Sequence, residues 1–181
     1  MGKIHKDVTV VGLRGSAGAG KTTLAKEWHT ILNRGYTMRL VSFAGPIKDG
    51  LAAMGICKGT QPEAYRYFAQ EIGGGMRARN NDHWVDIFRK VVVASAPSYQ
   101  VVVADDLRYP NEAALCDVIF RITPLGFNVT DLGERADHES EMWNRIDKTT
   151  GIEIINENGF SSRAAGAMHH YIQREVKETT R

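Results

Sequence analysis

The sequence has little of what secreted, membrane-spanning or nucleic-acid-coating proteins need. Its two cysteines, Cys57 and Cys116, lie far apart and show no metal-ligand spacing. A reduced cytoplasm suits them better than a disulfide framework, and we expect both side chains to be small buried hydrophobes. No stretch approaches the roughly 18 consecutive apolar residues of a membrane helix, and the N-terminal residues MGKIHKD lack a signal-peptide core. We therefore expect a cytoplasmic protein without a membrane partner.

The chain also lacks a large charge of one sign. Charged residues make up 24% of the sequence and the net charge is +2, which is ordinary for an enzyme and far from a polybasic nucleic-acid coat. No internal repeat or low-complexity tract divides the 181 residues. We expect a single domain over 1–181 that binds no nucleic-acid polymer.

Glycine, by contrast, is abundant, and several glycines lie in the segment GLRGSAGAGKTTLAKEW at 12–28. Gly15 to Thr22 match the pattern G-x-x-x-x-G-K-[ST], between a β-branched run at 8–13 and a helical pattern at 22–32. In such a loop, backbone N–H groups and the helix N-terminus surround a phosphate chain. The bland alternative is a glycine-rich turn with a chance lysine.

The loop predicts an ATP site with a magnesium ion. Lys21 would add a point charge at the phosphates, and the Thr22 hydroxyl would bind Mg²⁺. The predicted ATP-binding residues of the loop are Gly15, Ser16, Ala17, Gly18, Ala19, Gly20, Lys21, Thr22 and Thr23.

Apolar periodicity predicts strands that alternate with helices, and hence a parallel α/β sheet. The expected strands are 8–13, 38–43, 100–104, 117–122 and 151–155, and the expected helices are 22–32, 46–54, 60–72, 82–96, 111–116, 138–148 and 161–177. A capping box at Thr60 opens the third helix, with Phe68 on its buried stripe, and the triplet Gly73-Gly74-Gly75 follows it. Little periodicity appears from 123 to 137, where we expect a loop or flap.

Charged residues at the loop ends indicate the chemistry of the site. Asp105 and Asp106 follow the apolar strand VVVA, where open α/β sheets bind ligands. Either carboxylate could hold the metal, directly or through water, unless the pair is only a polar turn. Guanidinium groups bind phosphate in bidentate fashion, although any single arginine can equally be a surface charge. The arginines at loop ends are Arg77, Arg79, Arg108, Arg121 and Arg135.

The segment VVVADDLRYPNEA resembles the D-x-R-x-x-N-E signature of bacteriophage deoxynucleoside monophosphate kinases. The stretches FAGPIKDGL, AQEIGGGMRARNNDHWV, DHESE and IEIINENG are similar to further parts of that family, so the resemblance covers nearly the whole chain. Where the family often has G-T-E, this chain has the glycine triplet and is one residue shorter. The choice between Arg77 and Arg79 therefore stays open, with Arg77 favoured by its distance to Trp84.

The resemblance implies a three-layer P-loop kinase fold, with an acceptor-binding helical part at about 44–97 and a mobile lid at about 123–140. It implies ATP-dependent phosphorylation of deoxynucleoside monophosphates to diphosphates, with Mg²⁺. The implied catalytic residues are Lys21, Arg77, Arg108 and Arg135. The implied substrate-binding residues are Lys48, Arg77, Arg79, Trp84, Asp106, Arg108 and Glu112, with Asn156 at the ATP adenine and with Thr22, Asp105 and Asp106 at the metal.

Several alternatives stay open at this point. Trp84 could belong to the core, Lys48 to the surface, and DHESE, with His138, Ser140 and Glu141, to a helix cap. The acceptor could be a nucleoside or a phosphometabolite, and a nucleotide-dependent switch or ATPase is a rival of another class. The sequence leaves open which bases are accepted and whether the chain forms a homodimer.

Overall fold

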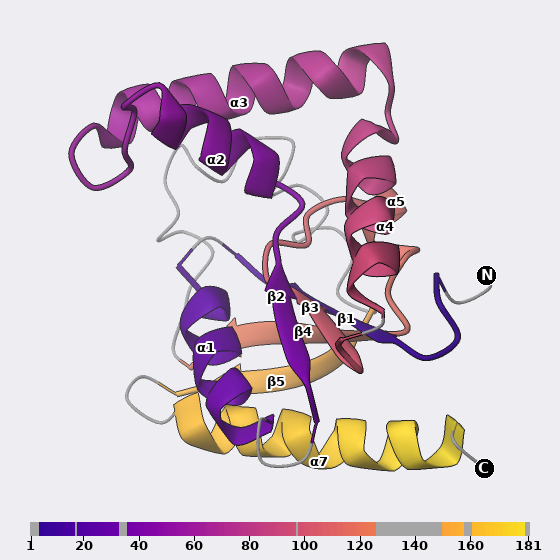
Figure 1. Ribbon diagram of the computed structural model, residues 1–181. Coiled ribbons are helices and arrows are strands. Elements are labelled where there is room, and N and C mark those ends of the chain that lie inside the picture. Colours follow the sequence, from indigo (N-terminus) through magenta and orange to yellow (C-terminus); the bar gives the residue numbers. More distant parts are fainter. Residues whose placement is uncertain are drawn as a thin grey trace.

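A five-stranded parallel sheet forms the centre of the protein, as the computed structural model in Figure 1 shows. The structure describes residues 4–16, 18–32, 36–96, 98–125, 150–157 and 161–179. The strands are β1 (Thr9–Arg14), β2 (Met38–Val41), β3 (Val101–Ala104), β4 (Val118–Pro124) and β5 (Ile152–Asn156), in the order β2-β3-β1-β4-β5. All four strand pairs are parallel, as the alternation of elements predicted.

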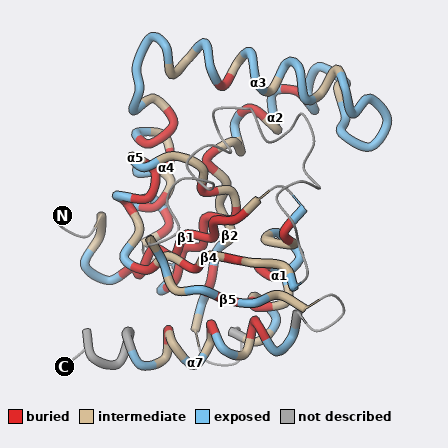
Figure 2. The backbone as a smooth tube through the Cα atoms, turned by 180° about the vertical axis from the view of Figure 1, so that it is seen from behind, coloured by how far each residue is buried: buried red, intermediate tan, exposed pale blue. Residues whose placement is uncertain are grey.

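Helices cover both faces of the sheet, which gives the three layers that were expected. They are α1 (Lys21–Leu32), α2 (Gly45–Ala53), α3 (Pro62–Arg79), α4 (His83–Ser95), α5 (Pro110–Ala113) and α7 (Ser161–Thr179). Alternate residues of β1 point to opposite faces: Val11 and Leu13 pack with α1 and α7, and Val10 packs with α4. Every residue of β1 and β3 is buried, and Figure 2 shows this burial concentrated in the central strands.

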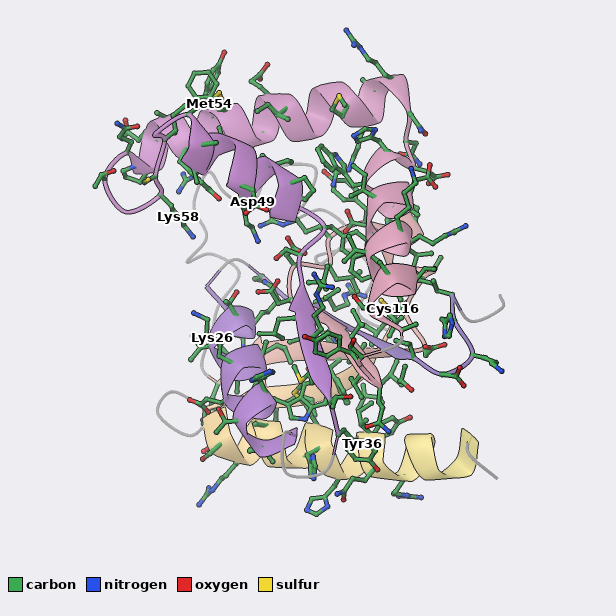
Figure 3. All side chains as sticks on the ribbon, viewed as in Figure 1. Lys26, Tyr36, Asp49, Met54, Lys58 and Cys116 are labelled. Carbon is green, nitrogen blue, oxygen red and sulfur yellow. The ribbon has the colours of Figure 1, made fainter. Side chains whose placement is uncertain are left out.

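The helices α2 and α3 form an arm that stands away from the sheet (Figure 1). Its own small core contains Ile47, Leu51 and the Trp84 indole from α4. Met54, directly after α2, is exposed and lies on the side of the arm remote from the sheet (Figure 3). The arm is thus held mainly by contacts near α4 and near the carboxyl ends of the strands.

Four expectations about local structure were wrong. The capping box expected at Thr60 does not form, because α3 begins at Pro62 with Gln61 as its N-cap and no side-chain cap. The triplet Gly73-Gly74-Gly75 does not follow the third helix but lies inside α3, which continues to Arg79. On the expected stripe, Phe68 is 40% exposed, because the arm has few partners on that side. Cys57 is exposed rather than buried.

The loop or flap expected from residue 123 does not begin there, since β4 continues through Pro124. Pairing of Thr123 and Pro124 with β5 explains this extension. The rest of the predicted lid and the helix at 138–148 lie outside the described residues. Among the helices that the structure does describe, none has the length and apolar character that crossing a bilayer requires.

Candidate functional site

The candidate site lies at the carboxyl ends of β1 and β3, which are neighbours in the sheet. After β1 the chain passes to β2 on one side, and after β3 it passes to β4 on the other side. Open parallel sheets bind ligands at such a reversal of strand order. The glycine loop follows β1, and the two aspartates follow β3, so two segments about 90 residues apart meet at this edge.

The backbone of the glycine loop has a shape that only glycine adopts easily. Gly18 and Gly20 have φ angles of 83° and 81°, in the left-handed region that disfavours side chains. A Cβ atom on Gly15 would lie 2.5 Å from the Ile122 carbonyl oxygen, and one on Gly20 would lie 2.6 Å from the Asn156 amide nitrogen. No side chain of these glycines covers the main-chain N–H groups of the loop, as phosphate binding by such groups requires. Ala17 lies outside the described residues.

Asn156 contacts the glycine loop, and its implied contact with the ATP adenine stays a prediction. Its Nδ2 donates to the Ala19 carbonyl oxygen at 3.1 Å, so the end of β5 holds the glycine loop in place. Its Oδ1 is buried and has no partner within the described part of the chain.

Lys21 and Thr22 begin α1 and lie directly at the loop. The Lys21 ammonium donates to the carbonyl oxygens of Gly15 and Ser16 at 2.6 and 2.9 Å. The Thr22 hydroxyl donates to Asp105 Oδ2 at 2.9 Å, and its proton points to the carboxylate because an ionised carboxylate only accepts. Thr23, the next residue, is exposed on the same turn.

The oxygen atoms beside the loop fit a magnesium ion. With its proton committed to Asp105, the Thr22 hydroxyl keeps its lone pairs for a cation. Mg²⁺ takes oxygen ligands, usually one or two from the protein and the rest from water and phosphate. Asp105, rather than Asp106, is the carboxylate that contacts Thr22.

Asp106 binds the turn between β2 and α2. Its two carboxylate oxygens accept the backbone N–H groups of Phe43 and Ala44 at 2.8 and 3.1 Å. The Lys48 ammonium lies 3.3 Å from Oδ2 of the same carboxylate. Lys48 is therefore not a purely surface lysine, because its ammonium contacts the largely buried Asp106 carboxylate at the base of the arm.

Ser42 is a site residue that the sequence reasoning missed. Its hydroxyl donates to Asp105 Oδ1 at 2.6 Å and accepts from the Lys48 ammonium at 2.7 Å. A serine next to a short strand has no distinctive spacing, so only the sheet register could have revealed it.

Arg77 and Glu112 form a half-buried ion pair on the other side of the site. Arg77 Nη2 lies 3.0 Å from Glu112 Oε1, and the Glu112 side chain is 2% exposed. The other oxygen, Oε2, accepts the backbone N–H groups of Arg108 and Tyr109 at 2.8 and 3.2 Å. Burial raises the pKa of Glu112 above its ordinary value, although the Arg108 N–H group and the Arg77 charge act in the opposite direction.

Both oxygens of Glu112 are occupied, so Glu112 orients Arg77 and the segment at Arg108. Its implied contact with substrate stays a prediction. The Arg77 guanidinium also lies over the Tyr109 ring, 3.9 Å from its centroid. Arg77 thus has a defined place beside Arg108.

The structure does not bring the remaining predicted residues into this cluster of contacts. Arg79 is exposed at the end of α3, and no contact of its side chain links it to this cluster. Trp84 is 5% exposed and donates its indole N–H to the Gly73 carbonyl oxygen at 3.2 Å, so it belongs to the core, as the bland alternative held. Arg121 pairs with Glu153 at 3.2 Å. Arg135, His138, Ser140 and Glu141 lie outside the described residues.

Comparison with known proteins returned no matching family model and no matching curated protein. Among solved structures, the chain is similar to the crystal structure of APE1195, with a TM-score of 0.48 and 10% identity over 95% of this chain and 98% of that one. It is also similar to an unliganded sugar kinase from Janibacter sp. HTCC2649, with a TM-score of 0.42 and 13% identity over 92% and 95% of the two chains. The sheet order, the three layers and the glycine loop define a three-layer α/β fold with a phosphate-binding loop after its first strand.

Proposed function

We propose that the protein is a kinase that transfers a phosphoryl group from ATP to a deoxynucleoside monophosphate. The observation that supports this is a continuous line of polar contacts from the glycine loop to the arm. Thr22 contacts Asp105, Asp105 contacts Ser42, and Ser42 contacts Lys48. Transfer of a phosphoryl group between two nucleotides requires that the donor site and the acceptor site lie next to each other.

The donor nucleotide would lie on the glycine loop. Backbone N–H groups at 15–22 and the Lys21 ammonium would bind its phosphates, for which Lys21 would exchange its loop carbonyl partners. Thr22 and Asp105 would hold Mg²⁺, which neutralises charge on the transferred group. Asn156 would keep the loop in shape through Ala19.

The acceptor phosphate would lie between Arg77, Arg108 and Lys48. Arg77 is oriented by Glu112 and by the Tyr109 ring, so its guanidinium loses little freedom when a phosphate binds. No catalytic base is required, because a phosphate monoester dianion already carries its nucleophilic oxygen. The proposed reaction therefore needs only groups that bind phosphate and metal, and no residue that removes a proton.

A coupled assay of ADP release tests the proposal. Each deoxy- and ribonucleoside monophosphate is supplied with MgATP, alongside nucleosides and ATP alone. We expect turnover with at least one deoxynucleoside monophosphate. Phosphorylation of nucleosides but not of monophosphates would reject the acceptor class, and acceptor-free hydrolysis stimulated by a protein or nucleic acid would favour a switch or ATPase.

Arg77 and Arg79, two positions apart in the sequence, provide a matched pair of variants. Arg77→Ala removes a guanidinium held at the site, and we expect kcat/KM for the acceptor to fall at least about 100-fold, with little change in ATP affinity. Arg79→Ala removes an exposed guanidinium, and its kcat/KM should stay within about twofold of the original. Arg108→Ala should likewise lose turnover more than ATP affinity. Equal losses in Arg77→Ala and Arg79→Ala would contradict the assignment.

A further inference from the structure

Ser42 occupies its position because of the sheet register. β2 and β3 are parallel, and Val41 pairs with Ala104 at their carboxyl ends. The next residues, Ser42 and Asp105, therefore leave the sheet side by side, although 63 positions separate them in sequence. This brings a hydroxyl group against the carboxylate that contacts Thr22.

The directions of the two hydrogen bonds at Ser42 are determined by chemistry. An ammonium group has no acceptor, so Lys48 donates to the Ser42 oxygen. The Ser42 proton is then committed to Asp105, which only accepts when ionised. Ser42 thus accepts a hydrogen bond from Lys48 of the arm and donates one to Asp105. Loss of the Ser42 hydroxyl removes both bonds at once.

The hydroxyl is not needed to hold the turn in which it lies. Asp106 already accepts both N–H groups of Phe43 and Ala44, and the Gly45 N–H group donates to the Ser42 carbonyl oxygen at 3.0 Å. These bonds involve the backbone and Asp106 alone. Loss of the Ser42 hydroxyl should therefore leave the turn folded, while Lys48 keeps its 3.3 Å contact with Asp106 and Asp105 keeps its hydrogen bond from Thr22.

We infer that Ser42 is a positioning residue that connects the two substrate sites: its hydroxyl holds Lys48 toward the acceptor and Asp105 toward the metal. The inference rests on the proposed function, because it assigns Lys48 to the acceptor phosphate. Lys48 is 42% exposed, so without this 2.7 Å bond its long side chain is restrained only by its 3.3 Å contact with Asp106 and gains other conformations. Ser42 accordingly contributes to acceptor binding without touching the acceptor.

A double-mutant cycle on the acceptor KM tests the inference. The variants are Ser42→Ala, Lys48→Met and the combination, measured with the deoxynucleoside monophosphate that the unmodified protein uses fastest. We expect each single change to raise the acceptor KM about tenfold, in line with loss of a hydrogen bond to a charged group. Because the two changes remove the same contact, the combination should be no more than about twofold worse than Lys48→Met.

Ser98→Ala is the matched control, since Ser98 is exposed and precedes β3, at the opposite end of that strand from Asp105. Its effect should be negligible alone and in combination with Lys48→Met.

Ser42→Ala should also raise the Mg²⁺ concentration for half-maximal rate about threefold, a change that a purely structural role would not produce. Thermal melting of each variant identifies any that is misfolded, and Ser42→Thr, which keeps the hydroxyl, then replaces the alanine test and should retain the original KM.

Two results would overturn the role of Ser42. One is a combined variant whose KM equals the product of the two single effects, and the other is an unchanged magnesium requirement in Ser42→Ala. The failure of the proposed function is a separate result, because the unmodified protein would then turn over no deoxynucleoside monophosphate at all.

Discussion

Asp105 and Asp106 are adjacent residues with different partners. Asp105 contacts the hydroxyl groups of Thr22 and Ser42, whereas Asp106 contacts Lys48 and the backbone after β2. Successive residues at a strand end point in opposite directions, so one pair can serve the metal side and the arm. The sequence predicted a pair of carboxylates here and could not divide their roles.

Gly20 is a residue at which geometry permits a sharp test. In Gly18→Ala and Gly20→Ala, a left-handed φ angle costs about 1–2 kcal/mol. Only Gly20→Ala also pushes the Asn156 side chain from the Ala19 carbonyl, which costs about 1 kcal/mol more. Urea unfolding should therefore show a larger loss of stability for Gly20→Ala than for Gly18→Ala. Equal losses would mean that Asn156 does not hold the loop.

Among the elements, α3 shows most clearly where local propensity was overridden. Three successive glycines predicted an end, because each glycine weakens a helix by about 1 kcal/mol. The helix continues because Ile72 and Met76, on either side of the triplet, pack on the core of the arm. The Gly73 carbonyl oxygen, moreover, accepts the Trp84 indole and lies 3.4 Å from Arg77 Nη1. The extra turns bring Arg77 to Glu112.

Two of these glycines can be replaced to stabilise the protein. A Cβ atom on Gly74 or Gly75 would meet no atom within 4 Å, and both lie inside α3. Each change to alanine should raise the free energy of unfolding by about 0.5–1 kcal/mol and Tm by roughly 2–3 °C. Gly55→Ala is the control, because Gly55 also has open space but a φ angle of 76°. Calorimetry should show it destabilised.

At the scale of the whole molecule, the strand order brings the site together. β1 and β3 are central and buried on both faces, so the segments that follow them emerge from the most rigid part of the protein. The arm carries Lys48, which contacts Asp106 after β3, and Arg77, which contacts Glu112 of α5. A ligand that bridges loop and arm would therefore stabilise the whole fold.

Binding of MgATP should be visible as a thermal shift. At about 100 times Kd, a ligand specific for the folded state stabilises it by about 2.7 kcal/mol, which corresponds to roughly 5–10 °C for a chain of this size. Lys21→Met should lose most of this shift, and removal of Mg²⁺ by a chelator should reduce it. Lys26→Met is the matched control, since Lys26 is exposed on the same helix (Figure 3). A full shift in Lys21→Met would contradict ATP binding at the loop.

The sequence by itself determined the strands, most helices, the α/β class and the glycine loop with Lys21 and Thr22. These depend on periodicity and on short motifs, where the interacting residues are close along the chain. Tertiary structure alone decided that Ser42 joins Asp105, 63 positions away, and that Glu112 holds Arg77, 35 positions away. The reason is physical: strand register and the packing of α3 bring these residues together, and neither leaves a local pattern in the chain.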